Sequence, residues 1–225
     1  MIVKRDKMFG KIEKDLVAMS NVVFEQVEII RKRLDAQIIT DVESKLDQNE
    51  LILDSFEVKL RRNVINTIML HNPRATDMRK IISCYDIAIN LERIGDLLLN
   101  IQHHLDKINF KGAIYKDLKP MLSKIYSTTE LMVKNAFNSY LNQDVSLTLP
   151  TIQLDDTVDS LYHEIRNRIV VISKGKSHAE SDLYEIMAVS DLSYNIERIA
   201  DYATNIIEAS VYLIEGKNIQ HTKIV

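Results

Sequence analysis

The sequence predicts an all-α protein that consists of two tandem three-helix bundles related by an internal repeat. The first observation is the repeat itself, because residues 86–101 (DIAINLERIGDLLLNI) recur as residues 191–206 (DLSYNIERIADYATNI) at a fixed offset of 105. The second is the small number of turn-forming residues, five Gly and three Pro in 225 residues, which favours long helices over many short strands. The third is the helical spacing of apolar residues in both halves.

The repeat preserves polar side chains more than apolar ones. Eight of its 16 positions are identical, and six of those eight pairs are polar or charged. A repeat kept for packing alone should preserve the apolar positions and let the polar ones change. The polar face of this helix is therefore the candidate functional surface. The identical pairs are Asp86/Asp191, Asn90/Asn195, Glu92/Glu197, Arg93/Arg198, Ile94/Ile199, Asp96/Asp201, Asn100/Asn205 and Ile101/Ile206.

The first two predicted helices occupy residues 4–39 and 43–70. Apolar residues recur at helical spacing from Ile12 to Leu34, which indicates one long amphipathic helix. The second helix should end before Pro73, because proline disfavours the helical conformation in the residue that precedes it.

The third predicted helix, 76–106, carries the first copy of the repeat. Thr76 is a suitable N-cap, and Asp77 places a negative charge in the first turn, where it suits the helix dipole. Residues 107–116 are the expected linker, and Pro120 suits the first turn of a fourth helix that runs to about 142.

The last two predicted helices follow the plan of the first half. Pro150 should open a helix that ends near Gly175, and Ser181 and Asp182 mirror the helix start in the first half before a final helix to about Leu213. The predicted division of the chain is residues 1–106 for the first three-helix repeat, 107–116 for the linker and 117–225 for the second repeat.

Composition and charge exclude several classes of protein. The net charge is −3 without a basic stripe, which argues against nucleic acid as a partner. The sequence has no apolar run of 18 residues, so no membrane span is expected, and the N-terminus lacks the apolar region of a signal peptide. A single cysteine, Cys84, excludes an internal disulfide framework and suits a reducing cytosol.

Four acid-x-x-x-acid pairs lie in register in the two halves. Two carboxylates four residues apart share one side of a helix and destabilise it by roughly 0.2–0.5 kcal/mol per pair. Most of these acids have no Lys or Arg three or four residues away, and only Arg93 and Arg198 reach one member of a pair in that way. The pairs are Glu50/Asp54, Glu92/Asp96, Asp155/Asp159 and Glu197/Asp201.

Three explanations of these pairs remain open on the residues alone: a solvated acidic face, cations from a neighbouring helix, or bound metal ions. If metal binds, its ligands are hard oxygens. The sequence has no Glu-x-x-His motif of the ferritin-type di-iron enzymes, and Cys84 and the histidines are not clustered as in a zinc site. Carboxylates alone suit Mg, Mn, Ca or oxygen-ligated iron.

With these motifs in hand, the chain resembles the PhoU family of phosphate-signalling proteins. The resemblance covers nearly the whole length and is carried by LERIGDLLLNI and IERIADYATNI, by the turn HNPRATDMR and by LDDTVDSLY. It implies two tandem three-helix bundles whose E(D)xxxD motifs bind clusters of divalent or trivalent metal ions, such as iron. The metal ligands that it implies are Glu50, Asp54, Glu92, Asp96, Asp155, Asp159, Glu197 and Asp201.

The resemblance also implies a regulator and not an enzyme. PhoU proteins are similar in acting at the cytoplasmic face of the membrane, where they link the phosphate ABC transporter to a sensor histidine kinase and keep phosphate-starvation genes off. Long exposed helices favour a homodimer. The alternatives are a carboxylate-cluster phosphohydrolase, for which the sequence offers no nucleophile–base pair, and a metal-free helical scaffold.

Overall fold

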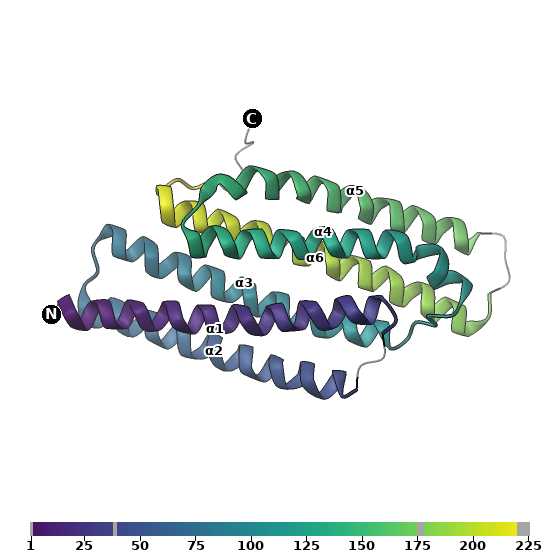
Figure 1. Cartoon of the computed structure of the whole chain (residues 1–225), viewed down its shortest axis with the longest axis horizontal. Coiled ribbons are helices and arrows are strands. Elements are labelled where there is room, and N and C mark those ends of the chain that lie inside the picture. Colours follow the sequence, from purple (N-terminus) through teal and green to yellow (C-terminus); the bar gives the residue numbers. More distant parts are fainter. Residues whose placement is uncertain (1, 38–39, 175–177, 220–225) are drawn as a thin grey trace.

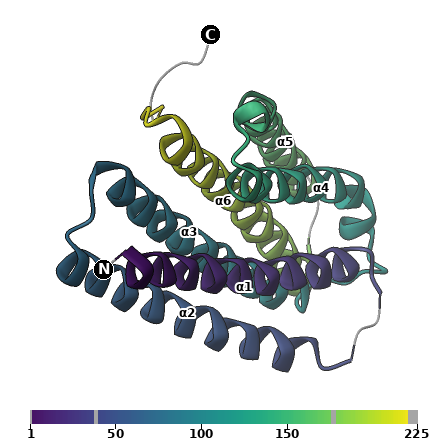
Figure 2. The ribbon, with the colours of Figure 1, turned by 60° about the vertical axis from the view of Figure 1, so that its left-hand side comes forward.

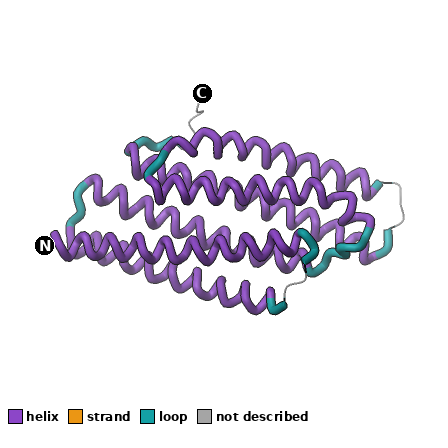
Figure 3. The backbone as a smooth tube through the Cα atoms, viewed as in Figure 1, coloured by secondary structure: helices purple, strands orange, loops and turns teal. Residues whose placement is uncertain are grey.

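The computed structural model describes residues 2–37, 40–174 and 178–219, and these residues form six α-helices and one 3-10 helix. This architecture confirms the predicted all-α fold with two sets of three long helices (Figures 1 and 3). The helices are α1 (Ile2–Leu34), α2 (Val42–His71), α3 (Ala75–Leu105), α4 (Ala113–Asn142), α5 (Thr148–Ser173) and α6 (Glu180–Glu215), with the 3-10 helix η1 (Val145–Leu147) between α4 and α5. The division of the chain into units at 1–106 and 117–225 stays a prediction.

The helices of each half pack on one another, and the two bundles meet along α3 and α6 (Figure 2). Helix α4 also touches α1, so the contact between the bundles involves four helices in all. Helices α2 and α5 lie on the outer sides of the molecule (Figure 1). Within the described part of the chain, α2 contacts only α1 and α3, which leaves its outer face without a partner.

The core consists of the apolar stripes that the helical spacing predicts. On α1 the side chains from Ile12 to Leu34 that define the stripe are buried, and on α3 the stripe from Ile87 to Ile101 is fully buried. Burial of one such Leu or Ile side chain contributes roughly 1.5–3 kcal/mol relative to its exposure. The buried stripes therefore position the remaining, polar faces of α2, α3, α5 and α6.

Two tyrosines of the second bundle donate hydrogen bonds to the backbone of the first. The fully buried Tyr126 hydroxyl of α4 donates a hydrogen bond of 2.7 Å to the backbone carbonyl of Val27. Tyr115, which lies nearer the start of α4, donates a hydrogen bond to the backbone carbonyl of Leu34. Burial of both phenols without these acceptors would leave hydroxyl groups unpaired, so the two hydrogen bonds fix the position of α1 against α4.

The prediction that Pro120 lies in the first turn of the fourth helix is wrong. The helix begins at Ala113, inside the predicted linker, and Pro120 lies within it. The early start is favoured because it buries the side chains of Tyr115 and Leu118. Pro120 cannot donate to the carbonyl of Lys116, but Lys116 is exposed and water can satisfy that carbonyl. Pro150, by contrast, lies in the first turn of α5 as predicted.

Other helix ends differ by a few residues. Helix α3 begins at Ala75 with Arg74 as its N-cap, so Thr76 does not cap it. Helix α1 ends at Leu34 because Ala36 adopts a left-handed conformation with φ of 60°. Helix α6 begins at Glu180, where the carboxylate of Asp182 accepts a hydrogen bond from the Ala179 backbone N–H at 3.3 Å. The predicted ends of the first and fifth helices, 39 and 175, lie outside the described residues.

None of the described helices contains a stretch that is both long enough and apolar enough to cross a membrane.

Candidate metal centre

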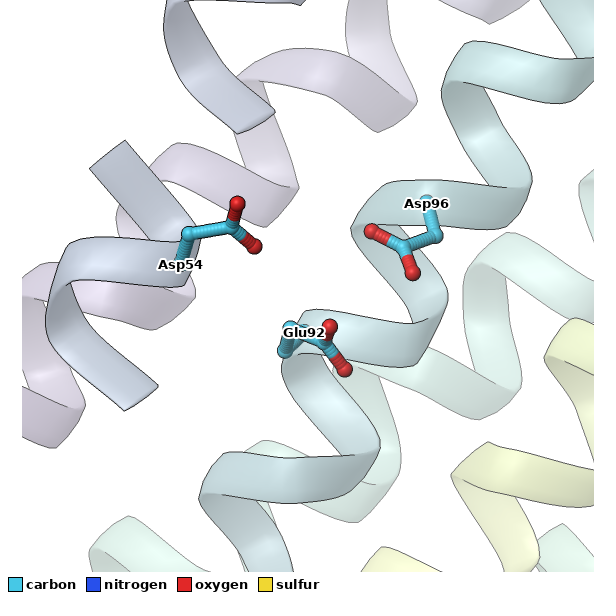
Figure 4. Close-up of side chains that lie close together, drawn as sticks. All are labelled: Asp54, Glu92 and Asp96. Carbon is cyan, nitrogen blue, oxygen red and sulfur yellow. The ribbon is translucent and has the colours of Figure 1, made fainter. Parts of the chain in front are cut away.

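Three carboxylates converge where α2 lies against α3. Asp54 reaches from α2 toward Glu92 and Asp96 on α3 (Figure 4). Each of the three offers an oxygen, and these oxygens all lie within 4.8 Å of one another. The geometry thus brings Asp54, one member of the predicted α2 pair, together with both members of the predicted α3 pair.

The neighbouring buried residues determine where these carboxylates lie. Leu53, which precedes Asp54, is buried in the core, and so are Leu91 and Ile94, which flank the acids of α3. Side chains one position away from the buried stripe lie at the edge of the helix contact. Asp54 is consequently exposed, while Glu92 and Asp96 are partly buried.

The carboxylates of this group repel one another in a partly desolvated place. Burial, followed by the charges of Asp96, Asp54 and Glu57, raises the pKa of Glu92 to about 7. Burial also raises the pKa of Asp96, and the charges of Glu50 and Asp54 add to that shift. Glu50 therefore acts on the group electrostatically although it lies outside the close set of three.

Among the described residues, cations compensate this group only in part, because the charge of Arg93 lowers the pKa of Glu92 by less than burial and the neighbouring acids raise it. Arg93, the one cation within reach along α3, lies over the ring of Tyr202 in α6, with its guanidinium carbon 5.6 Å from the ring centroid. Arg61 is paired with Glu57 at 2.8 Å. Throughout the described residues, no Lys or Arg forms an ion pair with the three carboxylates of the group.

Arg31 and Arg33 of α1 form ion pairs with acids other than those of the close group. Arg33 binds Asp106 at 2.8 Å, and Arg31 binds Glu28 and Glu130. Counter-charges from the first helix were the main alternative to metal ions for the acids of α2 and α3. The ion pairs that the described side chains of α1 form do not include those acids.

The second half brings its predicted carboxylates close in a looser arrangement. Burial, followed by the charges of Asp201, Asp159 and Asp155, raises the pKa of Glu197 to about 7. Burial and the charges of Asp159 and Asp201 raise the pKa of Asp155 to about 6. All four acids of the α5–α6 seam thus act on one another. In the described part of the chain, however, the only three-carboxylate group within 4.8 Å is that of the first half.

The donor set fits a hard cation. The close group contains only carboxylate oxygens, and no Lys or Arg of the described residues forms an ion pair with it. Oxygen-rich sites of this kind suit Mg, Mn, Ca or iron bound through oxygen. A multiply charged ion here would convert the mutual repulsion of the carboxylates into attraction.

Stability without metal should fall as pH rises. The pKa values of Glu92 and Glu197 are about 7 in the folded chain, above the ordinary 4.5, so between pH 4.5 and 7 the folded state binds more protons than the unfolded state. Below pH 4.5 both carboxyl groups are protonated, so the loss of stability caused by their buried, mutually repelling charges is absent. Above pH 7 that loss is complete. We expect the melting temperature in chelator to decrease steadily from pH 5 to pH 8.

Thermal unfolding followed by circular dichroism measures this slope. The double variant Glu92→Gln/Glu197→Gln is the control, because it removes the two groups with a pKa of about 7 and should make the dependence shallower, leaving the contribution of Asp155, whose pKa is about 6. A melting temperature that increases with pH over this range in the chelated protein would contradict the arrangement of charges described above.

Three other matched polar residues of the repeat, Asn90, Asn205 and Arg93, lie at the contact between the bundles. Asn90 is buried, and its side-chain oxygen accepts a hydrogen bond of 3.4 Å from the amide of Asn205 in α6. Arg198 donates to the hydroxyl of Tyr202 at 2.6 Å, so both repeat arginines contact this tyrosine. The sequence analysis did not identify Tyr202 as a partner of these arginines. The only signal in the sequence was that the two arginines are identical in the two copies of the repeat.

Comparisons with known proteins agree with this architecture. The PhoU domain matches residues 16–104 and 122–210. The chain is 30% identical over 214 residues, 93% of this chain and 88% of the relative, to the phosphate-specific transport system accessory protein PhoU homolog 1 of Thermotoga maritima. It is 30% identical to the corresponding PhoU homolog of Aquifex aeolicus over 97% of both chains.

Two solved structures share the fold. The crystal structure of PhoU from Pseudomonas aeruginosa superposes with a TM-score of 0.83 at 24% identity, over 94% of this chain and 99% of that one. The phosphate transport system regulatory protein PhoU from Streptococcus pneumoniae superposes with a TM-score of 0.73 at 19% identity, over 95% and 98%. The domain match in both halves and the two full-length relatives show that the chain belongs to the PhoU family.

Proposed function

We propose that the protein is a metal-binding regulator of phosphate uptake and signalling. The observation that carries this proposal is the match of the PhoU domain to both halves of the chain, with the same carboxylate motifs at the outer seam of each. Relatives of nearly the same length are named accessory proteins of the phosphate-specific transport system. The proposed action is therefore on a transporter and its signalling pathway.

The proposed partners are the phosphate ABC transporter and a sensor histidine kinase. By coupling the two, the protein would repress the phosphate-starvation response when phosphate is abundant. It would act in the cytoplasm, peripherally at the inner face of the membrane.

The proposed metal ligands are the acids of the two outer seams. Asp54, Glu92 and Asp96 form the close group, and the charge of Glu50 contributes to the raised pKa of Asp96. In the second half Glu197 and Asp155 have raised pKa values because of burial and their acidic neighbours, as expected for a second carboxylate site without its cation. The full proposed set is Glu50, Asp54, Glu92, Asp96, Asp155, Asp159, Glu197 and Asp201.

Bound metal would change what the outer seams attract. Without metal each seam is acidic, whereas oxygen-ligated cations with open coordination positions would attract phosphate or an acidic surface of a partner. Because the ligands of each centre come from two helices, metal would also hold α2 against α3 and α5 against α6. Metal occupancy would in this way shift the balance between partners.

Deletion of the gene that encodes this protein in its source organism tests the regulator function. The expected result is phosphatase induction in medium with abundant phosphate, and restored repression when the wild-type chain is returned. Alkaline phosphatase activity of the cells measures both. Unchanged repression in the deletion strain would contradict the regulator proposal, whereas the metal proposal is tested separately by elemental analysis of the purified protein.

A further inference from the structure

A cavity of about 630 Å³ lies between the two bundles, where α3 packs against α6 (Figure 2). Its volume is typical of sites for small organic molecules, which often lie between domains. Four of the lining side chains are polar residues that are identical in the two copies of the repeat, namely Asp86, Asn90, Arg93 and Asn205. The close group of carboxylates contains none of the four, so metal binding does not account for this cavity.

The register of the two helices determines which residues face one another across the cavity. Helices α3 and α6 run in opposite directions, since α3 begins and α6 ends on the same side of the molecule (Figure 1). The amide of Asn205 donates a hydrogen bond of 3.4 Å to the side-chain oxygen of Asn90. Asp86 lies one turn before Asn90, and Ala209 lies one turn after Asn205. Asp86 is therefore opposite Ala209, and both residues line the cavity.

The repeat places an identical aspartate at the other end of this helix contact, where the opposite residue is basic. At the offset of 105, Asp86 and Ala209 correspond to Asp191 and His104. Burial lowers the pKa of the His104 imidazole, and the charge of Asp191 opposes that shift, so these two side chains interact. One aspartate of the matched pair is thus supplied with a basic side chain, whereas the other faces an alanine.

The carboxylate of Asp86 has no counter-charge of this kind. Among the described residues it forms no ion pair and accepts no hydrogen bond, and burial alone raises its pKa. Arg93 lines the same cavity, but it lies about 10 Å further along α3, with its guanidinium over the ring of Tyr202. Tyr212 lines the cavity at the position where the related end has Lys107. The cavity therefore lacks a protein cation at Asp86.

We propose that this cavity binds a small organic cation, whose ammonium or guanidinium group lies between the carboxylate of Asp86 and the paired amides of Asn90 and Asn205. The amide nitrogen of Asn90 donates a hydrogen bond of 2.7 Å to the backbone carbonyl of Asp86, which fixes the side chain. An amide oxygen has two lone pairs, so the oxygens of both asparagines can accept further hydrogen bonds from a cation. Glu208 adds a second carboxyl group to the lining.

An organic cation fits this cavity better than a metal ion does. In the part of the chain that the structure describes, three carboxylates come close together only in the group of Asp54, Glu92 and Asp96. The cavity instead combines carboxyl groups with amides and the Tyr212 side chain, which suit a larger hydrogen-bonding ligand. Such a ligand would contact α3 and α6 at once and would strengthen the contact between the bundles.

Titration calorimetry with agmatine, which has a guanidinium and an ammonium group on a four-carbon chain, tests the proposal. The wild-type protein should bind one molecule per chain with a dissociation constant between about 10 µM and 1 mM. Asp86→Asn should raise that constant at least about tenfold, because a charge-assisted hydrogen bond is lost. The matched control is Asp191→Asn, the same change at the related aspartate, which should leave binding unchanged.

The same titrations distinguish this cavity from the acidic seams on the outer sides of the bundles. Unchanged agmatine binding in Asp86→Asn would place the amine at those seams and overturn the proposal. Equal weakening in Asp86→Asn and Asp191→Asn would show a general effect of net charge and would also overturn it. Failure of the wild-type protein to bind agmatine below about 10 mM has the same meaning.

Thermal unfolding of Ala209→His provides a second, independent test. This substitution gives Asp86 the basic neighbour that Asp191 has and fills the cavity, so the variant should no longer respond to agmatine. At ten times the dissociation constant, agmatine should raise the melting temperature of the wild-type protein by about 3 °C or more. Ala209→Ser, which changes the same position without filling the cavity, should keep this response. An equal response of wild type and Ala209→His would overturn the proposal.

Discussion

Replacement of Asp96 by Asn will weaken metal binding to the first bundle at least about tenfold and will stabilise the metal-free protein. The two effects have one cause. Asp96 contributes one of the three converging oxygens, and its charge is the largest electrostatic contribution to the raised pKa of Glu92. Removal of the charge relieves a like-charge pair, which is worth about 0.5 kcal/mol. The same change removes a ligand from any bound cation.

Titration calorimetry with Mn²⁺ measures the affinity, and thermal unfolding in chelator measures the stability. Asp47→Asn is the matched control, because Asp47 is an exposed acid of α2 outside the close group and the substitution changes the net charge equally. It should leave both quantities almost unchanged. If the Asp96→Asn protein binds Mn²⁺ as tightly as the wild type, the metal site does not lie between α2 and α3.

The opposite signs of these effects distinguish a metal site from an ordinary structural contact. A substitution that simply damages the packing would lower the stability of the metal-free protein together with its affinity. Here the apoprotein should become more stable, since Asp96 has no cationic partner among the described residues. Loss of stability in chelator would favour the alternative of a metal-free scaffold in which Asp96 is part of the packing.

The sequence was sufficient to predict the acid pairs because the repeat presents them twice in one register. It could not show that, among the residues that the structure describes, the close group forms in the first half only. The difference is consistent with the side chains beneath the acids, which are Leu53 and Gly95 in the first seam and Val158 and Ala200 at the same offset in the second. Side-chain convergence to within a few ångströms depends on such packing between helices, which no spacing along one helix reports.

The position of Asn90 shows a second limit. A helical wheel places Asn90 opposite the core of its own bundle and thus on the exposed side, yet the side chain is only 8% exposed. The reason is that α6 of the other bundle covers this face and supplies Asn205 as hydrogen-bond donor. Arg93 is drawn away from Asp96 to Tyr202 by the same contact. Periodicity describes one bundle at a time and cannot show which polar face a second bundle will cover.

Gly95→Val is expected to lower the stability by about 2 kcal/mol or more, which corresponds to a decrease in melting temperature of roughly 4–8 °C for a chain of this size. A Cβ atom at Gly95 would lie 2.2 Å from Cδ1 of Leu53 and 3.2 Å from the side-chain oxygen of Gln26. Leu53 and Gln26 are almost completely buried, so neither can move aside without repacking of the core. The gain in helix propensity over glycine, below about 1 kcal/mol, is too small to compensate.

The control for this substitution is Gly10→Val in α1, where an added Cβ would meet no atom within 4 Å. Both glycines lie inside helices, so the two variants share the change in propensity and differ in the space available. Gly10→Val should be neutral or slightly stabilising, and thermal unfolding of both proteins in chelator measures the difference. Because Leu53 adjoins Asp54, displacement of α2 in Gly95→Val should also separate Asp54 from Glu92 and Asp96 and weaken Mn²⁺ binding. Equal melting temperatures for the two variants would mean that the seam can open at little cost, and rigid packing beneath the carboxylates would then not be what holds them together.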